Sequence, residues 1–430
     1  PTMKTIFRTT LAAAVLAAVV PTLLALHRPP SPTMLNQCAA VVLWGGLAMV
    51  VAPGRLLLRQ TGALLAAMGL VLLAALASWR FGTLPMSLSM QAVGLLAAAG
   101  LMVAVGASAA SGPQRTAVFV ALAWGLLASG VLSSGVALVQ VFAPDWADGD
   151  WIAQAVLPGR AVGNLRQPNH LCDLLLWALV AAVGLHALGK LGCAWLWGLA
   201  VLLVVGVELS ASRTGAAGLL LLLLWGVLDR RLPASARWVL VATPFLYGLA
   251  YLGMGWWGDY SQQALGAGAR VSAEVAAGGG SPNARPNVWR TTWLLVLQQP
   301  WTGVGFGEFN FAWSLTAFDH RPTAFFDHTH NLALQLMVEL GLPLSALVLL
   351  LMAAALVQAA LAALRAQGEA ATVSRACLLL VLLCGLHSQV EYPLWYAYFL
   401  LPTALAWGMA LGTPGRPAGD AASPAPTRRN

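Results

Sequence analysis

The feature that most constrains this chain is a series of apolar runs, each long enough for a helix that crosses a membrane. Spanning a hydrocarbon core of ~30 Å takes roughly 20 consecutive apolar residues in a helix, and such runs recur from residue 6 to residue 412. Only 9% of the residues are charged, against about 25% in an ordinary soluble domain. The sequence therefore predicts an all-α polytopic membrane protein.

We expect about twelve transmembrane helices, nine within residues 1–258 and three within 331–412, separated by a long loop at 259–330. Two of the spans are nearly contiguous, which implies a sharp turn at Ser210–Ala211–Ser212–Arg213. Residues 413–430 are rich in Pro, Ala and Arg and are predicted to form a disordered cytoplasmic tail. The predicted spans are 6–26, 35–52, 61–79, 88–109, 116–143, 168–188, 193–211, 213–229, 236–258, 331–364, 373–390 and 393–412.

The distribution of basic residues predicts the orientation of these spans. An even number of spans puts both termini on one side, and the positive-inside rule makes the side with more Lys and Arg in short loops cytoplasmic. The termini are therefore predicted to be cytoplasmic, with segments 144–167 and 259–330 on the outer side. The basic residues on the predicted cytoplasmic side are Lys4, Arg8, Arg55, Arg59, Arg115, Lys190, Arg230, Arg231, Arg237, Arg365, Arg375, Arg416, Arg428 and Arg429.

The long outer segment contains the most irregular part of the sequence. A glycine-rich stretch at 278–281 precedes a Trp-rich run at 288–297, and a run of that composition favours a helix at the membrane interface. Gly303, Gly305 and Gly307 follow and predict tight turns. Whatever chemistry the chain performs is expected on this side.

A polar stripe enters the apolar run that follows this segment. Asn331, Gln335 and Glu339 recur at every fourth position and so share one helical face, with His330 next to its start. Polar groups in a membrane are costly unless they line a site, and a neutral imidazole is suited to general-base catalysis near neutral pH. The alternative is a histidine that only caps a helix start. His320 and His328 are weaker candidates, and a metal site at Asp327, His328 and His330 lacks a further cluster of ligands.

Arginines on the outer side are candidates for binding an anionic leaving group. Arg213 stands at the junction of two spans, Arg290 lies in the Trp-rich run, and Arg166 with Gln167 precedes a span. A guanidinium stays charged and holds phosphate oxygens through paired donors, although snorkelling to lipid head groups is the alternative. Four other arginines on the outer side are predicted to be solvated: Arg160, Arg270, Arg285 and Arg321.

The last outer turn offers Glu391 and Tyr392 as site-lining residues, while Tyr396 and Tyr398 are better explained as part of an aromatic belt. The sequence carries neither a P-loop nor a dinucleotide-binding glycine fingerprint. We therefore expect a lipid donor reached from the bilayer, no cofactor, no metal and no nucleic-acid partner. The five cysteines all lie in apolar segments, which predicts small buried side chains with no disulfide framework.

These motifs together resemble the O-antigen ligase superfamily, often called Wzy_C. His330–Asn331 with Glu339, Leu340 and Gly341 is similar to its His-Asn signature, Ser212–Arg213–Thr214–Gly215 to its Ser-Arg element, and Arg290 to its loop arginine. The resemblance covers about residues 160–400. It implies a GT-C-like glycosyltransferase of the bacterial inner membrane with a periplasmic active site.

The resemblance further implies that a glycan passes from undecaprenyl pyrophosphate to an acceptor hydroxyl, with inversion and without a metal. His330 would be the base, Arg213 and Arg290 would bind the pyrophosphate together with Arg166, and Asn331, Gln167, Glu339, Glu391 and Tyr392 would support the site. Three acceptors remain open within the superfamily. They are the lipid A–core oligosaccharide of WaaL-like ligases, a pilin-type protein as in PglL-like O-oligosaccharyltransferases, or another repeat unit as in polymerases.

Different parts of the sequence favour different acceptors. Arg166–Gln167–Pro168–Asn169–His170 and Glu391–Tyr392–Pro393–Leu394–Trp395–Tyr396 resemble the protein-glycosylating branch. The short sequence after Gly412 is more similar to the ligase branch, so lipid A–core is the favoured expectation. An exporter of lipids or sugars is the rival from another class, and would have paired interrupted spans in two related halves.

Overall fold

The computed structural model describes residues 3–27, 31–52, 54, 57–155, 157–276, 285–318, 322 and 324–413. Within these residues the protein is built from helices and contains no β-sheet, which confirms the predicted all-α fold. Nine helices are long and apolar enough to cross a membrane within the described part of the chain, and three shorter apolar helices accompany them. The fold is that of a polytopic membrane protein.

The long helices follow the predicted apolar runs closely. Their bounds are α1 Met3–Leu23, α2 Met34–Val51, α3 Leu58–Phe81, α4 Met86–Ser111, α5 Arg115–Phe142, α6 Pro168–Ala187, α9 Ala234–Ser261, α13 Leu332–Arg365 and α14 Gly368–His387. The shorter apolar helices are α7 Cys193–Leu209, α8 Arg213–Leu228 and α15 Ala397–Gly412. The predicted sharp turn between α7 and α8 is present, and Ala211 in that turn has a positive φ of 49°.

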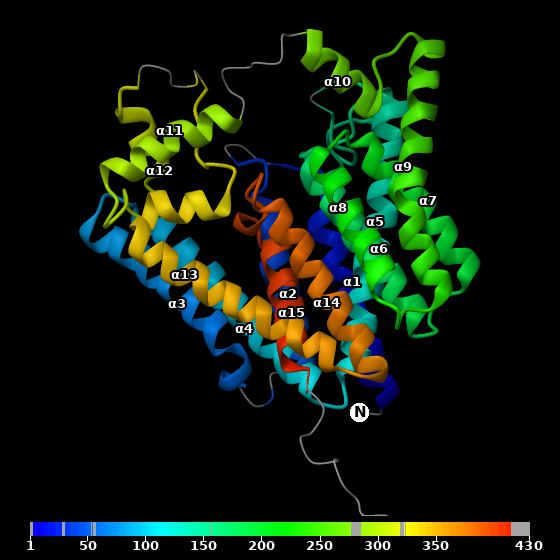
Figure 1. Ribbon diagram of the computed structural model, residues 1–430, viewed down its shortest axis with the longest axis horizontal. Helices are drawn as coiled ribbons and strands as arrows, with labels where there is room; N and C mark the ends of the chain where they lie inside the picture. The colour runs from blue at the N-terminus through cyan, green and yellow to red at the C-terminus, as the bar shows by residue number, and fades with distance from the viewer. Residues whose placement is uncertain are drawn as a thin grey trace, which may run out of the picture.

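Three further helices lie at one end of the bundle, where α13 also begins (Figure 1). They are α10 Gly266–Ala276, α11 Arg285–Gln298 and α12 Phe309–Leu315, and the short 3-10 helices are η1 Pro144–Trp146 and η2 Pro393–Trp395. A small apolar core joins α11 and α12 to the first part of α13, through residues that include Val288, Phe309, Trp313 and Val338. We call α11, α12 and the loop between them the outer unit.

The outer unit is fixed to α13 at a kink that the sequence did not reveal. The run 331–364 was predicted as a single span, but Gly341 has φ 74° and ψ 168° and divides α13 into two helices. An added Cβ at Gly341 would lie 2.5 Å from the Trp301 carbonyl oxygen, so only glycine fits. The N–H of Leu342 donates to the Pro300 carbonyl at 2.7 Å. The polar stripe therefore lies on a short first segment, residues 332–340, and not on the long spanning helix.

The bundle itself is held by close packing of small residues. α4 and α15 approach so closely that an added Cβ on Gly408 would lie 2.2 Å from the Val103 carbonyl oxygen, and one on Gly412 2.2 Å from that of Ala107. Pairs of small residues four apart allow such contacts between membrane helices. The helix α6 is almost wholly enclosed by its neighbours, since 89% of the residues in its most apolar stretch are buried. The N-terminus of α6, which carries Asn169 and His170, is thereby fixed in position.

Gly408→Val is expected to destabilise the protein, because its side chain would meet the α4 backbone, and overpacking costs about 1–3 kcal/mol or more. The thermal unfolding midpoint in detergent should fall by several degrees. Gly94→Val on α4 is the matched control, since an added Cβ there meets nothing within 4 Å. Equal midpoints for the two variants would contradict the close α4–α15 contact.

The cysteines only partly follow the prediction. Cys172, Cys377 and Cys384 are buried, but Cys38 and Cys193 are exposed on the outside of the bundle. The expectation that all five are buried is therefore wrong for two of them. An apolar run shows that a helix is buried in protein or lipid, but not which of its faces meets the lipid.

Candidate functional site

The candidate site is built around the carboxylate of Glu391, which lies in the turn between α14 and α15. Glu391 is only 5% exposed. Its Oε1 accepts a hydrogen bond of 2.8 Å from Asn169 Nδ2 and also pairs with the guanidinium of Arg285. Its Oε2 lies 2.7 Å from Nδ1 of His330. One buried carboxylate thus joins the start of α6, the start of α11 and the residue before the N-cap of α13.

His330 is positioned by its backbone as well as by Glu391. Its φ is +57°, a left-handed conformation that histidine tolerates better than most residues. The rings of Tyr392 and Phe326 lie edge-on to the imidazole, with centroids at 5.0 Å and 5.9 Å. Because a carboxylate only accepts hydrogen bonds, Nδ1 must be the protonated nitrogen of the neutral ring, which leaves Nε2 as an acceptor. The side chain remains 19% exposed, so a substrate can reach it.

The charges around Glu391 keep it ionised. Burial by itself would raise the pKa of this carboxyl, but the hydrogen bond and charge of His330 and the charge of Arg285 lower the pKa to about 2. A carboxylate beside an imidazole both orients the ring and stabilises its protonated form. This arrangement suits a histidine that must take up a proton during a reaction.

A second hydrogen bond extends the network to the turn between α7 and α8. Asn169 Oδ1 accepts from Ser212 Oγ at 2.6 Å, and Ser212 in turn caps α8 by accepting from the Gly215 N–H at 3.3 Å. Asn169 and Ser212 are both buried. Two motifs that lie far apart in the sequence, around residues 166–170 and 210–215, therefore meet at Asn169, which links them to the carboxylate of Glu391.

The predicted phosphate-binding arginines lie in different surroundings. Arg213 opens α8 directly after Ser212 and is exposed, and Arg290 is exposed on α11. Arg166 instead donates to the carbonyl of Ala25, just after α1, and its guanidinium nitrogen lies 3.0 Å from Nδ1 of His27. Arg213 thus directly follows a residue of the Glu391 network in the chain, while Arg166 fastens its loop to the segment that follows α1.

Three arginines that were predicted to be solvated are not. Arg285 forms the ion pair with Glu391, Arg160 Nε donates to the Ser210 carbonyl at 3.0 Å, and an Arg270 amino group donates to the Ala211 carbonyl at 2.6 Å. The prediction is wrong because a charge on a loop looks solvated in a sequence, and only the fold shows which carbonyl or carboxylate it meets. Arg321 and His320 lie outside the described residues.

Several predicted supporting residues have clear local roles. Gln167 caps α6, since its Oε1 accepts from the backbone N–H of Asn169 and of His170. Asn331 caps α13 by accepting from the Leu334 N–H at 2.9 Å, and its Nδ2 donates to the Gln389 carbonyl at 3.0 Å. Tyr392 stacks on His328 with ring centroids 4.2 Å apart. Burial raises the pKa of the Tyr392 hydroxyl well above its ordinary value, so this hydroxyl stays neutral.

Glu339 holds the outer unit to α13. Its carboxylate accepts from Gln335 Nε2 at 2.9 Å, and its carbonyl accepts from the Gly305 N–H at 3.0 Å. An added Cβ at Gly303 would lie 2.5 Å from the Glu339 carbonyl carbon, which explains a glycine at that turn. In the predicted stripe, Asn331 therefore caps α13, while Gln335 and Glu339 form a hydrogen-bonded pair where the outer unit is attached.

Arg285, Asn169 and Ser212 were not among the residues predicted to form the site. Ser212 directly precedes Arg213, Asn169 lies three residues after Arg166, and Arg285 begins the helix that carries Arg290. Their closeness in the sequence to those arginines could have identified them as candidates for the site. Among the described residues, no group of three or more His, Cys, Asp or Glu side chains lies close enough to hold a metal ion.

An apolar cavity of about 450 Å³ opens next to this network. It runs between α3, α4, α13 and α15, and Asp327 and His328 line it only two or three residues before His330. Tyr392 connects the two sides, because its ring contacts both His328 and His330. The apolar lining includes Leu64, Met68, Leu88, Ala92, Leu95, Leu336 and Met352.

Comparisons with known proteins match the parts of the chain that meet at this site. Residues 198–349 match the O-antigen ligase family, residues 161–186 a protein glycosylation ligase family, and residues 375–421 the C-terminal part of a family described as virulence factor membrane-bound polymerase. The chain is also 26% identical over 311 residues to the general O-oligosaccharyltransferase of Acinetobacter baylyi.

That alignment covers 70% of this chain and 52% of the relative, so the chain spans about half the length of the curated protein it matches. The three family matches include, in order along the chain, Asn169, Ser212, His330 and Glu391. These matches confirm the resemblance to the O-antigen ligase superfamily, with its PglL-like members, that the sequence motifs predicted.

Proposed function

We propose that this chain, which resembles the O-antigen ligase superfamily, transfers a glycan from undecaprenyl pyrophosphate to an acceptor hydroxyl. The reaction would occur at the periplasmic side of a bacterial inner membrane, with both termini in the cytoplasm. One observation carries the proposal: the buried carboxylate of Glu391 gathers His330, Arg285 and the Asn169–Ser212 pair at one end of an apolar helical bundle.

His330 is the general base of the proposed reaction. The acceptor hydroxyl donates a hydrogen bond to Nε2, and as its oxygen attacks the anomeric carbon its proton moves to that nitrogen. Glu391 on Nδ1 stabilises the resulting imidazolium. The new carbon–oxygen bond forms on the face opposite the leaving group, so the anomeric configuration inverts. The proton then leaves Nε2 for water or for the released lipid diphosphate.

The diphosphate leaving group requires positive charge at the same place. Arg213 and Arg290 are both exposed, and Arg213 follows Ser212 of the Glu391 network, so its guanidinium is a donor for the departing oxygens. Arg285 adds a third guanidinium, 31% exposed, which already lies at the site. Together they would hold the charge that develops as the glycosidic bond breaks.

The apolar cavity fits the lipid part of the donor. Its volume of about 450 Å³ lies in the ordinary range of roughly 300–1,000 Å³ for a ligand pocket, which is enough for the isoprenoid units next to the diphosphate. Asp327, His328 and Asn310 line it with polar groups. A lipid lying between α3 and α13 would then carry its diphosphate towards Tyr392 and His330.

Filling this cavity is expected to weaken donor binding. Leu88→Trp or Ala92→Trp should raise the KM for the lipid-linked donor about tenfold, because roughly 1.4 kcal/mol of lost contact corresponds to that factor, while kcat changes less. The measurement is a donor titration with purified protein in detergent. Ala97→Trp is the matched control, because Ala97 is exposed on α4 and does not line the cavity. If the variants with a filled cavity kept the wild-type KM for the donor, the cavity would not be part of the donor site.

The acceptor we favour is a hydroxyl of lipid A–core oligosaccharide, since residues 198–349 match the O-antigen ligase family. A protein acceptor such as pilin is the second candidate. It is favoured by the match of residues 161–186 to a protein glycosylation ligase family and by the similarity to a general O-oligosaccharyltransferase. A repeat-unit acceptor remains the third possibility, because residues 375–421 match a polymerase family.

The deciding experiment is to incubate the purified protein with a lipid-linked glycan and one candidate acceptor at a time. Modification of lipid A–core would support ligation, modification of pilin would support protein glycosylation, and longer glycans without either acceptor would support polymerisation. If no acceptor is modified while the reconstituted protein moves the lipid-linked glycan across vesicles, the exporter alternative replaces the proposal.

A further inference from the structure

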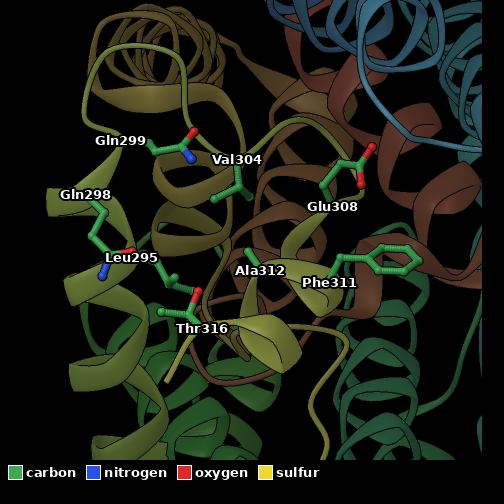
Figure 2. A pocket seen from close by; sticks show the side chains of 8 residues that line it. All are labelled: Leu295, Gln298, Gln299, Val304, Glu308, Phe311, Ala312 and Thr316. Carbon is green, nitrogen blue, oxygen red and sulfur yellow. The ribbon is translucent and has the colours of Figure 1, made fainter. Parts of the chain in front are cut away.

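A second cavity lies on the outer unit, away from the Glu391 network. It has a volume of about 230 Å³ and is open to the outside between α11 and α12. Figure 2 shows Gln298 and Gln299 on one side of it and Glu308 and Phe311 on the other. Nothing in the proposed reaction uses these residues.

The lining of this cavity is polar and rich in amides, and it includes one carboxylate, that of Glu308. Gln298 and Gln299 are exposed, and their side-chain amides make no hydrogen bond within the described part of the chain, so each offers donors and an acceptor. Thr316 adds a hydroxyl, and Leu295, Val304 and Ala312 add apolar surface. Glu308 is held by Thr83, whose N–H and hydroxyl donate to it at 2.9 Å and 2.6 Å.

This chemistry selects one class of ligand. No Lys or Arg lines the cavity, and a carboxylate is present, so a phosphate or an acidic sugar would be repelled. The amides and the hydroxyl would remain unpaired against a lipid chain, which makes a lipid unfavourable. A neutral sugar matches the lining, because its hydroxyls pair with amides and a carboxylate while its C–H face packs on apolar side chains and on Phe311, which is 52% exposed.

The position of the cavity relates it to the proposed active site. Arg285, which pairs with Glu391, begins α11, and Gln298 ends it. Thirteen residues of α-helix span roughly 20 Å. A sugar in the cavity would therefore lie a few units along a glycan chain from the sugar at His330.

We propose that this cavity is a glycan subsite that binds one neutral sugar of the substrate, several units from the bond being formed. The proposal rests on the proposed function. It adds that the protein binds an oligosaccharide and that binding depends on the length of that oligosaccharide. The residues around His330 by themselves require neither property. The cavity is open, so a sugar inside the chain can enter it with both neighbours attached.

The test compares a long lipid-linked oligosaccharide with a lipid-linked single sugar. In the variant Gln298→Ala/Gln299→Ala, the KM for the long donor should rise about tenfold more than the KM for the single-sugar donor. Ala312→Phe, which fills the cavity without removing a hydrogen bond, should change the ratio in the same direction. Gln263→Ala is the control, because Gln263 is an exposed glutamine near the end of α9, and it should keep the wild-type ratio.

Each arm has a distinct outcome. A change that depends on donor length assigns the cavity to the donor glycan. A change that appears only with lipid A–core and at every donor length assigns it to the acceptor glycan. The subsite would be overturned if both cavity variants kept the wild-type ratio of the two donor KM values, with lipid A–core and with pilin as the acceptor. An inactive wild-type protein would instead count against the proposed function, so the two failures are distinguishable.

Discussion

Replacing His330 by alanine is expected to lower the rate of glycan transfer by about 10²–10⁴-fold, the usual contribution of a general base. The reason is chemical, since alanine removes the imidazole that Glu391 orients through Nδ1 and whose Nε2 is to accept the proton. Asparagine is the more informative replacement. It tolerates the φ of +57° at this position and can still hydrogen-bond Glu391, yet it cannot take up a proton near neutral pH.

Both His330 variants should therefore be inactive, and the asparagine variant should keep the thermal unfolding midpoint of the wild type. The measurement is initial transfer rate in detergent with saturating donor and acceptor, beside a melting curve of each protein. His328→Asn provides a comparison two residues away, where a smaller loss is expected because His328 lines the lipid cavity. Normal transfer by His330→Asn would remove His330 as the base.

Replacing Glu391 by glutamine should have the second-largest effect, a fall in kcat of roughly 10²-fold or more with a smaller change in the donor KM. Glutamine has nearly the same shape but carries no charge, so it cannot stabilise a protonated imidazole, and it can orient the ring in the wrong tautomer. Glu391 acts through His330 and does not contact the reacting atoms, which makes it a positioning residue. Glu391→Asp keeps the charge and should restore part of the rate.

The decisive measurement for Glu391 is a double-mutant cycle with His330. If Glu391 acts through the imidazole, then Glu391→Gln should cost little further activity in a protein that already carries His330→Asn. A purely structural role predicts the opposite pattern: independent losses, a lower unfolding midpoint in Glu391→Gln and no rescue by aspartate. The buried Glu391–Arg285 pair makes some loss of stability expected, so the kinetic coupling is the stronger criterion.

Much of the fold could be predicted from the sequence, because the length of an apolar run is set by the thickness of a bilayer and not by neighbouring helices. The helices α4 and α5 begin within a few residues of the predicted starts at 88 and 116, and the turn between α7 and α8 lies where predicted. The kink at Gly341 was not foreseen, since a glycine and a proline inside an apolar run are also found in straight membrane helices.

The candidate site was predictable only in part. His330, Glu391 and Tyr392 were each singled out by polarity at the end of an apolar run, and the structure brings these three side chains together. Arg166 and Gln167 were singled out in the same way, but the hydrogen bonds of Arg166 fix its loop to the segment after α1 and those of Gln167 cap α6. Unusual polarity shows that a residue has a reason to be present, but a structural bond and a catalytic contact produce the same signal.

What the sequence by itself determined is the all-helical membrane fold, the segments in which polar groups cluster, and the family that the motifs resemble. These follow from hydrophobicity and spacing, which are local properties of the chain. Only the tertiary structure decided that Glu391 is the common partner of His330, Arg285 and Asn169, and that an apolar cavity opens beside them. Those contacts join residues as far apart in the sequence as 169 and 391. Such pairs form because of the way the helices pack around a buried charge, and no local sequence pattern shows them.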